Sequence, residues 1–151
     1  MKIVINSDFG GFGVSTDVLK KLVLKNAKCI KSFTPKHYYG GDSDNYLRAS
    51  EWEQKWNEDF EEFFDIGDGF KANKMESNVY KDGMLYSLKD ISDIEVRTDS
   101  DLIEIIEQVG AKNASASLAA LKVVEIPDGI EFKIDDYDGC ETIHEVHRSW
   151  S

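Results

Sequence analysis

The chain has little of several residues that mark particular classes of protein. It contains 2 prolines and 2 cysteines in 151 residues, and no run of about 18 apolar residues that could span a bilayer. With 41% hydrophobic residues, this composition argues against disorder and low complexity. Cys29 and Cys140 match no metal or redox spacing, and two thiols do not suggest a disulfide framework. We therefore expect a single globular domain over residues 1–151, with free thiols.

Histidine and arginine are also scarce, with three residues of each type. Three histidines leave little scope for acid–base catalysis, and no Ser, Cys or Thr lies in a recognisable nucleophile motif. His144 and His147 would point to opposite faces of an expected strand, which argues against a zinc site. The sequence thus predicts no catalytic residue, no metal site and no cofactor.

Acidic residues outnumber basic ones, and the formal net charge is −11. A chain of this charge repels nucleic acids and anionic membranes, so we expect neither as a partner. The apolar run at the N-terminus, Ile3 to Ile5, is too short for the hydrophobic region of a signal peptide. These features predict a cytoplasmic protein.

The charge is unevenly distributed along the chain. Residues 1–36 contain seven lysines and two aspartates, which give +5, so the remaining residues carry −16. A small anion could be held near this positive segment, but a lysine-rich helix face is also the ordinary pattern of a solvated surface. Both interpretations stay open at this point.

Hydrophobic periodicity and turn residues predict an α+β fold with a mainly antiparallel sheet and about three helices. Helices are expected to begin near residues 15, 50 and 99, and residues 111–120 fit either a loop or a short helical turn. Hairpins are expected around the turns Asp82-Gly83 and Asp138-Gly139. Strands are predicted at 3–5, near 29–33, and at 79–80, 84–86, 94–97, 121–126, 130–135 and 140–147.

A glycine-rich stretch between the first strand and the first helix has the logic of a phosphate-binding loop. Gly10, Gly11 and Gly13 would let backbone N–H groups approach an anion at the start of a helix. The spacing is not that of a P-loop or a dinucleotide fingerprint, and a tight turn needs glycine for steric reasons alone. Phe12 could stack on a base or fill the core. We call residues 10–13 the Gly loop.

Arginine is used so sparingly that its placement is a candidate signal. Arg97 and Arg148 could give bidentate recognition of a phosphate or a carboxylate beside the Gly loop. Salt bridges to neighbouring acidic residues are the alternative explanation.

The second expected helix carries large aromatic residues along one stripe, beginning with Trp52, Trp56 and Phe60. A stripe of this kind is most simply a core face. So much aromatic area would equally suit an interface with a partner or with another copy of the chain.

Longer patterns lie at the two ends of the chain. Residues 2–13 read KIVIN-x-x-x-GGFG, residues 97–103 read RTDSDLI, residues 121–127 read LKVVEIP, and residues 137–150 read YDG-x-E-x-x-x-E-x-HR-x-W. These patterns resemble a family of small uncharacterised proteins of bacteriophages and prophages. The resemblance leaves a variable middle at about 35–90 and supplies no activity or catalytic residues. It implies an accessory, anti-defence role in the infected bacterial cell.

Three functional hypotheses follow. The first is a non-enzymatic phage accessory protein that binds a small anionic ligand, such as a nucleotide signal, through the Gly loop, Arg97 and Arg148. The alternative is an acidic protein-interaction module that covers or inhibits a host protein. The second alternative is an enzyme that acts on a phosphoester.

Overall fold

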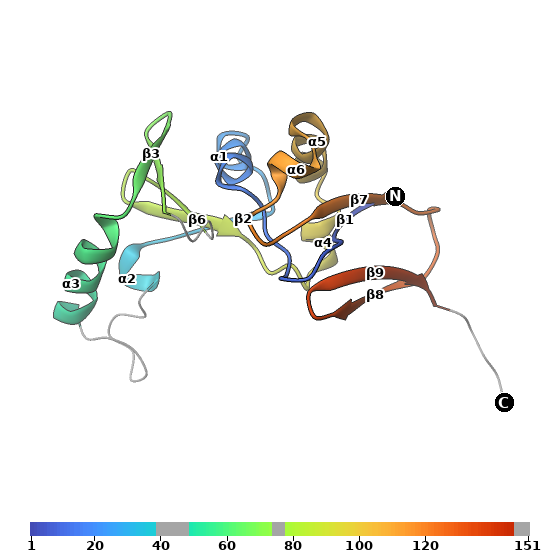
Figure 1. The fold of residues 1–151 in the computed structure, drawn as a ribbon. Helices are drawn as coiled ribbons and strands as arrows, with labels where there is room; N and C mark the ends of the chain where they lie inside the picture. The colour runs from blue at the N-terminus through green and yellow to red at the C-terminus, as the bar shows by residue number, and fades with distance from the viewer. Residues whose placement is uncertain (39–48, 74–77, 147–151) are drawn as a thin grey trace.

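The computed structural model describes residues 1–38, 49–73 and 78–146 (Figure 1). Within these ranges all paired strands are antiparallel, which confirms the expected α+β class with a mainly antiparallel arrangement. The elements are β1 (Lys2–Asn6), α1 (Thr16–Leu24), β2 (Ile30–Phe33), α2 (Pro35–Tyr38), α3 (Ala49–Phe60), β3 (Phe64–Gly67), β4 (Phe70–Ala72), β5 (Val79–Lys81), β6 (Met84–Leu88), α4 (Ile94–Arg97), α5 (Ser100–Val109), α6 (Ala111–Ala114), β7 (Leu121–Glu125), β8 (Phe132–Tyr137) and β9 (Cys140–Glu145).

Strand β1 lies at the centre of one half of the molecule and is covered on both faces. It pairs with β7, and Figure 1 shows α5 and α6 on one side of this pair and the β8–β9 hairpin on the other. Val4 belongs to the main core with the helices, whereas Ile3 and Ile5 point to the opposite face, which β9 approaches. This double burial explains why the strand is an unbroken β-branched run.

The other half is a five-stranded sheet in the order β2-β6-β5-β4-β3. Asp82 and Gly83 form the predicted turn between β5 and β6, both with positive φ, as a two-residue hairpin of matching twist requires. Helix α1 contacts this sheet as well as α5, so it lies between the two halves (Figure 1). Helix α1 begins where a helix was expected, and Ser15 caps it, because its side chain accepts from the Val18 N–H.

Several sequence-based expectations differ from the observed elements. Residues 94–97 form the short helix α4 and not a strand, because the Asp93 side chain accepts from the Glu95 N–H and caps a helical turn. No strand was predicted at residues 64–72, where the structure has the β3–β4 hairpin with positive φ at Gly67 and Gly69. Residues 111–114 are helical. Three helices exceed four residues, and among the described residues no helix is long and apolar enough to cross a membrane.

Candidate functional site

Three loops meet at the end of β1, and Asn6 joins them. Its fully buried side chain donates from Nδ2 to the carbonyl oxygens of Asp8 and Gly139, each at 2.6 Å. Its Oδ1 accepts from the Ala120 N–H at 2.8 Å. One amide therefore links the loop after β1, the segment before β7 and the β8–β9 turn, and all of its polar atoms are used.

Glycine is required where two of these loops touch. Gly139 has φ +89°, and a Cβ there would lie 2.9 Å from the Gly10 nitrogen and would also strike the Gly11 backbone. The Gly10 N–H donates to the Asp138 carbonyl at 3.4 Å, and the Gly13 carbonyl accepts from Ala116 at 3.0 Å. The Gly loop is thus packed against its neighbours at both ends, which is the structural role of glycine at a close backbone approach.

A buried ion pair between Arg97 and Glu141 also supports this junction. The guanidinium of Arg97 donates to both carboxylate oxygens of Glu141 at 2.7 and 2.8 Å, and the two side chains are 7% and 5% exposed. Glu141 also accepts from the Asn6 N–H at 2.8 Å. Arg97 further donates to the Val4 carbonyl at 3.2 Å, so the pair ties α4 and β9 to β1.

The protonation of Glu141 is fixed by these contacts. Burial by itself would raise the pKa of this carboxyl, but the hydrogen bonds from Arg97 and Asn6 and the charge of Arg97 outweigh it, so the pKa is lowered. Phe12 lies on the face of the same guanidinium, with 4.9 Å between the Arg97 Cζ and the ring centroid. One face of the guanidinium therefore lies against Phe12, and its N–H edge is bound by Glu141.

The junction presents three large apolar side chains to solvent. Tyr137 is 79% exposed, Leu118 is 76% exposed and Phe9 is 58% exposed, the three highest values among the large hydrophobic side chains that the structure describes. Phe9 and Tyr137 form an edge-on pair with centroids 6.4 Å apart. Leu118 lies against Gly10, and a Cβ added to Gly10 would lie 3.3 Å from the Leu118 Cβ. We call Phe9, Leu118 and Tyr137 the three-loop surface.

Charged residues within these loops are all acidic. Residues 7–13, 115–120 and 135–139 contain four aspartates and no lysine or arginine. Asp8 and Asp138 are exposed beside Phe9 and Tyr137, and Asp136 is exposed next to Tyr137. The three-loop surface is therefore an apolar patch with an acidic border.

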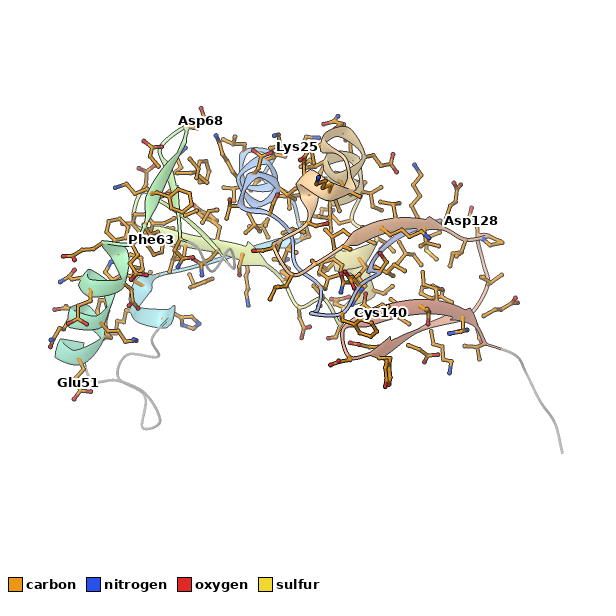
Figure 2. The ribbon with its side chains drawn as sticks, viewed as in Figure 1. Lys25, Glu51, Phe63, Asp68, Asp128 and Cys140 are labelled. Carbon is orange, nitrogen blue, oxygen red and sulfur yellow. The ribbon has the colours of Figure 1, made fainter. Side chains whose placement is uncertain are left out.

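The lysines of the positive N-terminal segment are dispersed and do not surround the Gly loop. Four of these lysines pair with described acidic residues, three of them from later in the chain. Figure 2 places Lys25 between α1 and α5 and Asp68 at the β3–β4 turn. This distribution explains the charge asymmetry as a set of contacts between elements. The pairs are Lys2–Glu107, Lys20–Asp68, Lys21–Asp17 and Lys25–Glu104.

Among the residues predicted to bind an anion, Phe12 lies against Arg97, whose charge is matched by Glu141. Gly10, Gly11 and Gly13 lie against Leu118, Gly139 and Ala116 instead. Arg148 lies outside the described residues. Because the charge of Arg97 is matched by Glu141, Arg97 is not free to hold an anion, although Lys89 lines a cavity of about 360 Å³ with Phe12 and Gly13.

The aromatic stripe lies elsewhere, on α3. Trp56 and Phe60 pack on each other at 5.1 Å and on Tyr80 of β5 at 5.5 and 5.0 Å, with Phe63 adjacent (Figure 2). Trp52 is half-buried, and its Nε1 is shielded without an acceptor among the described residues. Packing of α3 on the sheet accounts for most of this stripe. Its use as an interface stays a prediction.

Sequence analysis did not single out Asn6, Phe9, Leu118 or Tyr137. Asn6 and Phe9 lie between the first predicted strand and the Gly loop, and Tyr137 precedes the Asp138-Gly139 turn. An aromatic residue beside turn residues was the available signal. The partners lie more than 100 residues apart in the chain, which no local pattern reveals.

The remaining candidate chemistry is limited. Among the described residues no three His, Cys, Asp or Glu side chains are grouped to hold a metal ion. Burial, followed by the charge of Asp99, raises the pKa of the Cys29 thiol to about 12, so this thiol is not a nucleophile near neutral pH. Comparison with known proteins finds no match: no family model, no curated protein and no solved structure matches the chain.

Proposed function

We propose that this chain is a non-enzymatic protein-interaction module that binds a partner protein through the three-loop surface. The proposal rests on one observation: Phe9, Leu118 and Tyr137 are exposed together where the hydrogen bonds of Asn6 hold three loops in place. Aromatic side chains at the centre of a patch are typical binding anchors, because they lose little conformational entropy on binding. Asn6 and the Arg97–Glu141 pair hold the loops in advance, which lowers the cost of association.

The acidic border indicates the chemistry of the partner. Asp8, Asp136 and Asp138 surround the apolar anchors, so a partner with lysine or arginine around a hydrophobic pocket is complementary. The resemblance to phage and prophage proteins favours a protein of the bacterial host, covered or inhibited by this chain. The small-anion hypothesis has less support, because Arg97 is already matched and the Gly10 N–H is used within the protein.

The test uses the full chain with a photo-crosslinking amino acid at position 118 or 137. We expect a discrete adduct with one protein from both positions. Position 24 is the matched control, since Leu24 is 55% exposed on α1, far from the junction. The captured protein is then purified. Tyr137→Ser is expected to raise its Kd by about 30-fold or more, and Leu24→Ser by less than about 3-fold.

Two results would contradict this proposal. The first is the same set of adducts, or none, from positions 24, 118 and 137. The second is a Kd that Tyr137→Ser and Leu24→Ser change equally. A nucleotide that binds more tightly than about 1 mM and perturbs the amides of residues 10–13 would instead support the small-anion hypothesis.

A further inference from the structure

Strand β7 has one paired edge and one outer edge. On the paired edge, Met1 and Ile126 exchange hydrogen bonds in both directions at the end of the β1–β7 ladder. Bonded pairs alternate along antiparallel strands, so the backbone groups of Val123 and Glu125 point away from β1. Among the described residues, neither the N–H nor the C=O of Val123 or Glu125 has a hydrogen-bond partner.

Leu121 shows where this open edge begins. Its N–H also points away from β1 and donates to the Ser115 Oγ at 2.9 Å, so a side chain of the same chain completes this position. No described group completes the positions that follow. The outer edge therefore offers an alternating series of acceptors and donors from the Leu121 carbonyl to Glu125.

The opposite edge of the β1–β7 pair is closed. The Val4 carbonyl of β1 accepts from Arg97 at 3.2 Å, and the Asn6 N–H donates to Glu141 at 2.8 Å. The buried ion pair thus takes the place of a neighbouring strand beside β1. Only β7 leaves this two-stranded sheet able to grow.

The residues of β7 also suit an added strand better than those of β8. Val123 and Val124 are β-branched and half-buried at the middle of β7. In contrast, β8 carries the exposed charges of Lys133, Asp135 and Asp136, and charged side chains are an ordinary protection of a strand edge. The outer strands β2 and β3 belong to the sheet in the other half of the molecule.

We propose that an extended segment of the partner protein pairs with the outer edge of β7, antiparallel to it. The inference rests on the proposed function, because Leu118 of the three-loop surface precedes β7 by three residues, about 10 Å of chain. Another strand supplies donors and acceptors at the two-residue spacing of this edge. A second copy of this chain is disfavoured as the occupant, since each copy carries a net charge of −11.

The first test measures the edge in the full chain without the partner. In the free protein, the amides of Val123 and Glu125 should exchange with solvent faster than the amide of Val124, which faces β1. The probe is the pentapeptide acetyl-Lys-Thr-Val-Thr-Lys-amide. We expect it to shift the amide resonances of Val123 and Glu125 saturably, with a Kd on the order of 1–10 mM.

Two methylated forms of the probe give a matched control. With the central valine of the probe opposite Val123, the valine N–H faces β7 and the N–H of the following threonine faces away. N-methylation of the valine should weaken binding by at least about 5-fold, and N-methylation of that threonine by less than about 2-fold. The two forms have the same charge, so attraction to an acidic protein alone would not distinguish them.

The second test uses the partner captured from positions 118 and 137. Val123→Pro removes an N–H that faces away from β1, and proline is tolerated at such an edge position. Ser32→Pro is the matched control, because the β2–β6 register also points the Ser32 N–H away from its neighbour. Val123→Pro should raise the Kd of the partner by about 5-fold or more, and Ser32→Pro should leave it unchanged.

Several outcomes would overturn the inference. Slow exchange of Val123 in the free chain would show that the edge is already covered. Absence of saturable shifts up to about 20 mM probe, or equal binding of its two methylated forms, would show that β7 adds no strand. Protection of Val123 that grows with protein concentration would identify a second copy as the occupant. The crosslinks from positions 118 and 137 decide the proposed function separately, because neither position takes part in probe binding.

Discussion

Replacing Glu141 by glutamine tests the buried ion pair of the junction. The substitution conserves shape but removes the negative charge that Arg97 contacts at 2.7 and 2.8 Å. Arg97 is only 6% exposed, so its guanidinium would keep a buried and uncompensated charge. Loss of one member of a buried pair costs about 3–5 kcal/mol, a large part of the roughly 5–15 kcal/mol stability of an ordinary domain.

The assay is urea unfolding followed by circular dichroism. With a slope of about 2 kcal/mol per molar urea, Glu141→Gln should lower the midpoint by about 2 M. Glu104→Gln is the matched control, because its pair with Lys25 lies on the surface and contributes about 0.2–1 kcal/mol. The double variant Arg97→Met with Glu141→Leu should lose less stability than Glu141→Gln, since no unpaired charge remains.

The reasoning would be refuted by either of two results. One is a loss in Glu141→Gln no larger than that in Glu104→Gln. The other is additivity of the single substitutions at Arg97 and Glu141 in a double-mutant cycle, since a direct pair must show coupling of about 0.5–3 kcal/mol.

Three further predictions concern the same elements. Because the pKa of Glu141 is lowered in the folded protein, its ionised form adds stability above the unfolded pKa of about 4.3, and this stability is lost as pH falls through the folded pKa. Acid unfolding of Glu141→Gln should therefore lack this pH-dependent component, and an unchanged profile would refute it. Gly139→Ala should destabilise the protein more than Gly83→Ala, because both glycines have positive φ but only Gly139 faces another backbone; equal losses in thermal unfolding would contradict this. Ellman's reagent at pH 8 should modify Cys140 in the native state and Cys29 only after unfolding, and prompt reaction of both thiols would show that Cys29 is not buried.

Local sequence patterns were sufficient to predict much of the fold. Asp82-Gly83 and Asp138-Gly139 specified two hairpins, because few other dipeptides adopt positive φ at both positions. The start of the first long helix near residue 15 was also predicted correctly. Ile94–Arg97 was assigned wrongly, because its β-branched residues favour a strand while the capping side chain of Asp93 decides the local conformation.

The candidate site depended on contacts that sequence does not encode locally. Arg97 was a candidate for recognition of a phosphate or a carboxylate, but its partner Glu141 lies 44 residues away, beyond the reach of a local pattern. The Gly loop was predicted as either an anion-binding loop or a tight turn, and the structure places its glycines against Leu118, Ala116 and Gly139. Such pairings arise only when the fold brings distant loops together.

The central claim is that a partner binds where the three loops meet. Amide hydrogen exchange of the full chain, with and without the captured partner, measures this most directly. We expect protection in residues 8–13, 116–120 and 135–139, with α3 unchanged. Protection of α3 around Trp52, Trp56 and Phe60, with the three loops unaffected, would contradict the account and place the interface on the aromatic stripe.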